Sequence, residues 1–80
     1  MKPVNIGLLG LGTVGGGTAT VLQDNAAEIS RRLGREVRIS AVCDLSEEKA
    51  KQICPNAAFI KDPFELVQHQ DVDVVVELFG

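Results

Sequence analysis

The chain has 80 residues, of which 45% are hydrophobic and 24% are charged, and this composition is typical of one small globular domain. Eight basic residues against eleven acidic ones give a net charge of −3, which argues against nucleic acid or a membrane surface as partner. Two cysteines without a CxxC pairing indicate free thiols, and no leader or membrane-spanning run is recognised, so we expect a cytoplasmic protein.

The first part of the chain predicts a strand, a glycine-rich turn and a helix. Residues Val4–Leu9 are a nearly continuous apolar run that ends at Gly10, as expected for a strand buried on both faces of a parallel sheet. Apolar residues then recur at helical spacing, which predicts one long helix ending at Gly34. The apolar stripe of this helix consists of Val14, Ala19, Leu22, Ala26, Ile29 and Leu33.

Three further strands and two further helices are predicted downstream. The strands are β-branched or apolar runs at residues 37–43, 57–60 and 73–78. The helices begin after the capping residues Ser46 and Asp62, the second with Pro63 at its first position. Because strands and helices alternate, we predict an α/β fold with a doubly wound parallel sheet of the Rossmann type. About four of the usual six strands are present, so we expect residues 1–80 to be the N-terminal part of a nucleotide-binding domain, followed by further chain.

The turn after the first strand has the GxGxxG spacing of a dinucleotide-binding motif, Gly10-Leu11-Gly12-Thr13-Val14-Gly15. In this motif the first glycine permits the tight turn, the second leaves room for a pyrophosphate, and the third lets the helix pack closely. Backbone N–H groups at the helix start would then face phosphate oxygens. A tight turn in another kind of α/β protein could use the same glycines, and this alternative stays open.

Gly16 and Gly17 extend the motif and disfavour helix by about 1 kcal/mol each relative to alanine. Either the backbone there must approach a ligand or another segment closely, or the turn becomes ordered when a cofactor binds. The residues do not decide between these two interpretations.

Asp44 ends the second predicted strand, where a carboxylate can accept hydrogen bonds from the adenosine ribose. It lies 29 positions after Gly15, against roughly 20 in the usual pattern, and the long helix accounts for the excess. The alternative is that Asp44 caps the following turn or helix.

Charged residues elsewhere in the chain differ in how well they fit the same site. The basic cluster of Arg31, Arg32, Arg35 and Arg38 is expected at the opposite end of the sheet, too far to bind the 2′-phosphate of NADP. The residues after Asp44 are Leu45, Ser46, Glu47 and Glu48, with Lys49 as the first base, so this neighbourhood slightly favours NAD, or tolerates both cofactors, more than it selects NADP. His69 is expected in a loop and no metal site is predicted, whereas Glu77, near the end of an apolar strand, is a candidate for contact with cofactor or substrate.

Read together, these segments resemble the N-terminal region of homoserine dehydrogenases along the whole chain. The resemblance is carried by Ile6–Gly15, then by Asn25, Ile29, Arg32 and Gly34, by Val42-Cys43-Asp44-Leu45, and by Asp71–Gly80. It implies a parent enzyme that transfers a hydride between NAD or NADP and L-homoserine or L-aspartate 4-semialdehyde, in threonine, methionine and isoleucine biosynthesis.

The resemblance also implies roles for individual residues. Leu11 to Val14 would embrace the cofactor diphosphate, Asp44 would lie near the ribose, and Phe79 and Gly80 would begin a loop near the nicotinamide. Cys43 stands where many relatives carry a basic residue, which argues against a preference for NADP. The predicted cofactor-binding residues are therefore Gly10, Leu11, Gly12, Thr13, Val14, Gly15, Asp44, Phe79 and Gly80.

In this family the proton-transferring lysine and the substrate-binding region lie beyond residue 80. We therefore assign no catalytic residue to the chain and expect it to be inactive alone. The parent is expected to bind a small-molecule substrate, not nucleic acid or a membrane, and to be a homo-oligomer. Two alternatives remain: another NAD(P)-dependent dehydrogenase, or a nucleotide-sensing module without catalysis.

Overall fold

The computed structural model describes residues 2–11 and 17–78 of the chain. In chain order its elements are β1 (Val4–Leu9), α1 (Gly17–Asp24), α2 (Ala26–Leu33), β2 (Val37–Cys43), α3 (Glu47–Ile53), β3 (Ala58–Phe59), α4 (Pro63–Val67) and β4 (Val74–Glu77). Strands and helices alternate as the sequence predicts, although the segment between β1 and β2 holds two helices.

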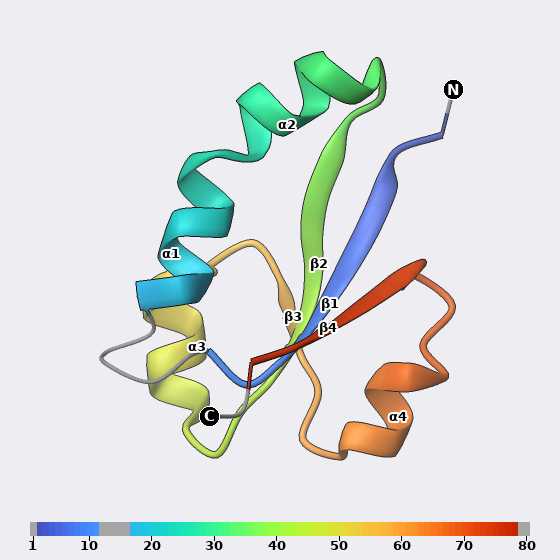
Figure 1. Cartoon of the computed structure of the whole chain (residues 1–80). Helices are drawn as coiled ribbons and strands as arrows, with labels where there is room; N and C mark the ends of the chain where they lie inside the picture. Colours follow the sequence, from blue (N-terminus) through green and yellow to red (C-terminus); the bar gives the residue numbers. More distant parts are fainter. Residues whose placement is uncertain (1, 12–16, 79–80) are drawn as a thin grey trace.

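The four strands form one parallel sheet in the order β3-β2-β1-β4. Helices α1, α2 and α3 lie on one side of this sheet and α4 lies on the other (Figure 1). This order is that of the first four strands of a doubly wound sheet, 3-2-1-4-5-6. The predicted fold class, the N-terminal part of a Rossmann-type sheet, is confirmed.

Among the described residues, the core consists of two apolar clusters, one on each face of the sheet. Leu8 and Val42 of the central strands pack with Ala19 of α1 and Ala50 of α3 on one face. On the other face, Leu66 of α4 packs against β2. Leu8 and Leu66 are fully buried, so each face of the sheet is sealed by at least one helix near its centre.

The prediction of one long helix is wrong in one respect, because the structure divides this helix into α1 and α2 at Asn25. The backbone of Asn25 has φ −96° and ψ 2°, outside the helical range, and its side-chain Nδ2 donates to the carbonyl of Val21 at 2.8 Å. Beyond the division, α2 buries no residue fully, and Leu33, which the sequence placed on the apolar stripe, is 61% exposed. Gly34 ends α2 in the left-handed conformation, with φ 71°, as predicted.

Capping side chains define the starts of the two later helices, as the sequence predicts. The hydroxyl of Ser46 accepts a hydrogen bond from the backbone N–H of Lys49 at 3.2 Å. The carboxylate of Asp62 accepts one from the N–H of Phe64 at 2.9 Å, and Pro63 follows at the first helical position. The third strand is shorter than the predicted 57–60, and the fourth spans four of the six predicted residues.

A bulge interrupts the pairing of the two central strands. Ile6 pairs with Ile39 and Gly7 pairs with Ala41, so Ser40 is an extra residue in β2. The Ser40 hydroxyl donates to the carbonyl of Asp71 at 2.6 Å, which fastens the loop before β4 to the sheet. Because of the extra residue, Ile39 and Ala41 pack on opposite faces although they are two positions apart.

Gly7 leaves room for the packing of the loop before β4. A Cβ atom on Gly7 would lie 2.9 Å from Cγ1 of Val72 and 3.3 Å from Cδ2 of Leu66. The first distance is shorter than van der Waals contact, and the valine side chain is short and branched, so it cannot move aside freely. The absence of a side chain at Gly7 therefore sets how closely this loop approaches β1.

We expect Gly7→Ala to lower the free energy of unfolding by about 1–3 kcal/mol, because the new methyl group overpacks the contact with Val72. Urea unfolding of the purified protein measures this change. The double variant Gly7→Ala/Val72→Ala should show a positive coupling, with less destabilisation than the sum of the two single changes. Gly17→Ala is the control: no described atom outside its own helix lies within 4 Å of the added Cβ, so this variant should not be destabilised and should gain helix propensity. A Gly7→Ala protein as stable as the parent would contradict this packing.

Candidate cofactor-binding site

The turn that leaves β1 begins at Gly10. Its backbone has φ 87°, in the left-handed region that glycine adopts without strain, and its N–H donates to the carbonyl of Cys43 at 2.7 Å. The tight turn that the sequence predicts at Gly10 is therefore present, and it is tied to the end of β2.

The rest of the glycine motif is described only in part. The side chain of Leu11 is 1% exposed and packs in the core with Leu8 and Ala19, so any contact of Leu11 with a cofactor would use its backbone. Four of the predicted site residues in the turn and two at the C-terminus lie outside the described residues: Gly12, Thr13, Val14, Gly15, Phe79 and Gly80. Their predicted roles stay predictions.

Asp44 follows β2 directly, next to the glycine turn. The pairing of Leu9 with Cys43 places the end of β1 beside the end of β2, so Gly10 and Asp44 leave the sheet at the same place. One carboxylate oxygen of Asp44 accepts a hydrogen bond from the N–H of Ser46 at 3.1 Å. The alternative role of Asp44, as the cap of the following turn, is therefore present in the structure. The second oxygen of a carboxylate can still accept from a ligand.

A pocket of about 340 Å³ lies at the carboxyl ends of β2 and β3. It is lined by Asp44, Leu45, Glu47, Phe59 and Lys61. Leu45 is fully exposed and, with Phe59, gives the pocket apolar surface beside the carboxylate of Asp44. This combination suits a flat, largely apolar ring joined to a hydroxylated sugar, and the volume is within the usual range for small-molecule sites, roughly 300–1,000 Å³.

Lys61 was not predicted as a site residue. It is 17 positions from Asp44 in sequence, but the parallel pairing of Val42 with Phe59, extended by the hydrogen bond from Ile60 N to Val42 O at 2.8 Å, brings it to the same pocket. The predicted strand at residues 57–60 could have indicated Lys61 as a candidate. A ligand site at the carboxyl ends of parallel strands includes the residues after β3 as well as those after β2.

Both cysteines are free and buried. Burial raises the pKa of the Cys43 thiol above its ordinary value of 9.0, and the carboxylates of Asp44 and Asp62 raise it further. Burial also raises the pKa of Cys54. Both thiols are therefore protonated at neutral pH, and Cys43 contributes no charge beside Asp44.

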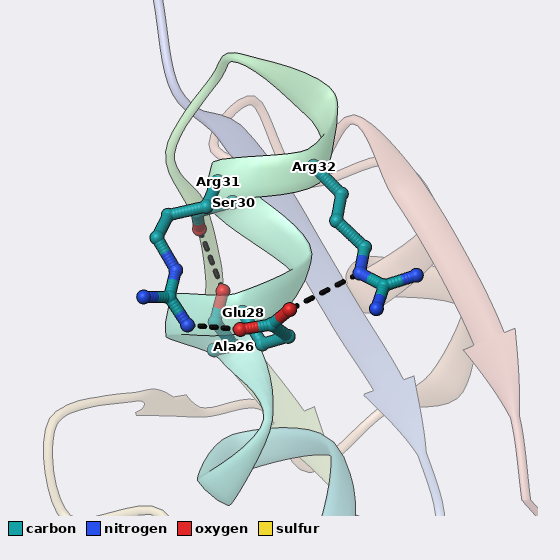
Figure 2. Close-up of polar contacts among 5 residues, drawn as sticks. All are labelled: Ala26, Glu28, Ser30, Arg31 and Arg32. Carbon is teal, nitrogen blue, oxygen red and sulfur yellow. Dashed lines mark hydrogen bonds and ion pairs between the residues drawn. The ribbon is translucent and has the colours of Figure 1, made fainter.

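The basic cluster lies where the sequence predicts, at the end of the sheet away from Asp44. Arg35 donates twice to the backbone carbonyl of Lys2, before β1 begins, and Arg38 donates to the side chain of Asn5 at 2.7 Å. Arg31 and Arg32 extend from α2 toward the carboxylate of Glu28 (Figure 2). These arginines serve contacts within the chain, so they are not candidates for binding the cofactor.

Two further candidates lie on the remaining strand and loop. Glu77 pairs in register with Leu9 at the end of β4 and is exposed, near the ends of the other strands. His69 lies in the loop after α4, as expected, and its Nδ1 accepts from the N–H of Asp71 at 3.2 Å. His69 also lines a larger cavity of about 660 Å³, which runs along the amino-terminal half of β2, away from Asp44.

Residues 2–11 and 17–78 hold no cluster of three or more His, Cys, Asp or Glu side chains that could bind a metal ion. Over the same residues, no helix combines the length and hydrophobicity that crossing a membrane would require.

The strand order, the glycine turn after β1 and the acidic residue after β2 together define a Rossmann-type dinucleotide-binding domain. Residues 10–80 match the sequence profile described as "Homoserine dehydrogenase, NAD binding domain", and the chain belongs to this family. The expected resemblance is confirmed.

Individual relatives agree with this assignment. The chain is 85% identical to a homoserine dehydrogenase of Neisseria gonorrhoeae, matching all of this chain and 18% of that protein. It is 49% identical to a homoserine dehydrogenase of Methylobacillus glycogenes, again over all of this chain and 20% of the other. The crystal structure of a homoserine dehydrogenase from Thiobacillus denitrificans superposes with a TM-score of 0.74 at 48% identity, covering 96% of this chain and 18% of that one. The chain thus spans about a fifth of the length of these relatives.

Proposed function

We propose that this chain binds the adenosine half of NAD or NADP within a homoserine dehydrogenase. The observation that supports this most directly is the meeting of the Gly10 turn and Asp44 at the carboxyl ends of adjacent strands, beside the pocket that contains Leu45 and Phe59. The relatives are named homoserine dehydrogenases, so the parent enzyme would oxidise L-homoserine. The family resemblance implies L-aspartate 4-semialdehyde as the other reactant.

The described residues fit such a cofactor. Asp44 would accept hydrogen bonds from the ribose hydroxyls, and Leu45 and Phe59 would contact the adenine ring. The segment from Gly10 to Gly15 would hold the diphosphate through backbone N–H groups. When bound, the nicotinamide ring supplies hydride chemistry, whereas this chain contributes binding and orientation. Phe79 and Gly80 would begin the loop on the nicotinamide side.

Within this proposal NAD is slightly favoured over NADP. Asp44 and Glu47 both line the pocket, and a carboxylate near the ribose repels a 2′-phosphate. The thiol of Cys43 is protonated at neutral pH and does not offset this charge.

The wider role of the parent follows from the proposed activity. It would act in threonine, methionine and isoleucine biosynthesis, in the cytoplasm, on a small-molecule substrate and as a homo-oligomer. The two buried free thiols are compatible with a reducing compartment. Proton transfer and substrate binding would come from residues outside this chain, so the segment alone would be inactive.

A substrate panel tests the proposed activity. The full-length protein should reduce NAD or NADP with L-homoserine and should be much less active with other hydroxy amino acids and with sugar alcohols, followed by nicotinamide absorbance. Turnover of another hydroxy substrate in place of homoserine would favour a different dehydrogenase. Binding of the cofactor without turnover of any substrate would favour a nucleotide-sensing module.

We expect Asp44→Ala to shift the ratio of NAD to NADP affinity toward NADP by about tenfold, because a charged hydrogen-bond acceptor for the ribose and a source of phosphate repulsion are lost together. Calorimetric titration of the full-length variant with each dinucleotide measures the ratio. Asp44→Asn is the matched variant, since its side-chain oxygen can still accept from the N–H of Ser46. An unchanged ratio in Asp44→Ala would count against the assigned role.

A further inference from the structure

Among the residues that the structure describes, Lys61 is the one basic side chain that lines the pocket beside Asp44. It follows β3 and is separated from the turn after β2 in sequence, yet the β2–β3 pairing places both at the same pocket. The residues that directly follow Asp44 are Leu45, Ser46, Glu47 and Glu48, so the turn itself offers no cation.

The ammonium group of Lys61 is available to a ligand. The side chain is exposed, and within residues 2–11 and 17–78 it forms no ion pair. Lys51, by contrast, is engaged, because it forms an ion pair with Glu47 at 3.1 Å. This pair also partly neutralises Glu47, which lines the pocket.

The neighbouring carboxylate of Asp62 does not compete directly for Lys61. One of its oxygens accepts the hydrogen bond from the N–H of Phe64 that caps α4, and no ion pair joins Asp62 to a cation among the described side chains. Asp44 and Lys61 are therefore the two charges of the pocket without a charged partner in the described structure, and they have opposite signs.

We infer that Lys61 is the residue that lets this site accept NADP, by binding the phosphate on the 2′ position of the adenosine ribose. The inference rests on the proposed dinucleotide site. A lysine ammonium is a compact charge on a flexible stem and binds phosphate well as a point charge. Asp44 favours the unphosphorylated ribose and Lys61 favours the phosphorylated one, so the pocket binds both cofactors.

The two dinucleotides provide an internal control, because they differ only in the 2′-phosphate. Calorimetric titration of the full-length protein with NAD and with NADP should show that Lys61→Gln weakens NADP binding about five- to tenfold and changes NAD binding less than twofold. Lys61→Arg should retain most of the NADP affinity. Lys49→Gln, which alters a lysine outside the pocket lining, should leave both affinities unchanged.

Ionic strength gives a second readout. The NADP affinity of the unaltered protein should fall more steeply with salt than its NAD affinity, and Lys61→Gln should reduce this difference. Retained NAD binding shows that the variant is folded.

Each outcome decides the inference. An NADP affinity that Lys61→Gln leaves unchanged, an equal loss for both dinucleotides, or an unaltered protein that binds NAD but not NADP would overturn it while leaving the proposed function in place. An unaltered protein that binds neither dinucleotide would refute the proposed function itself.

Discussion

The site depends on the parallel pairing of β2 with its two neighbours up to the carboxyl ends of the strands. Leu9 lies opposite Cys43, and the N–H of Gly10 continues the ladder to the Cys43 carbonyl. When two parallel strands pair up to their carboxyl ends, the residues that follow them lie at the same edge of the sheet. The glycine turn and Asp44 therefore lie next to each other. β3 pairs with β2 in the same direction and adds Lys61 to the same pocket. A change in either register would separate these residues even if each element formed normally.

The packing on the α4 face supports this arrangement through small local adjustments. The extra residue Ser40 shifts the register between the two halves of β2, and its hydroxyl holds the loop before β4. Opposite the bulge, Gly7 has no side chain, so Val72 in this loop can pack directly against β1. Bulges in parallel pairs are uncommon, and here the bulge lies in a central strand four residues before Asp44, where it sets how the second half of β2 faces its neighbours.

Patterns within a few residues allowed much of the fold to be predicted. β1 and β2 follow from apolar and β-branched runs, and the helix starts follow from Ser46 and Asp62, because each depends on interactions within one turn or strand. The division at Asn25 depends on a hydrogen bond from the Asn25 side chain to the backbone carbonyl of Val21. The spacing of hydrophobic residues carries no information about such a hydrogen bond. The bulge at Ser40 and the place of Lys61 depend on how separate strands align, so neither could be read from one segment alone. Of the candidate site, Gly10 and Asp44 lie as predicted, whereas the side chain of Leu11 belongs to the core.

The central claim is that a dinucleotide lies across the carboxyl ends of β1 and β2. A crystal structure of the full-length protein with bound NAD measures this most directly. The account predicts a ribose hydroxyl within hydrogen-bond distance of the Asp44 carboxylate, about 2.5–3.0 Å, with adenine against Leu45 and the diphosphate at residues 10–15. Nucleotide bound at another place, with the Asp44 pocket closed or filled by protein side chains, would contradict it.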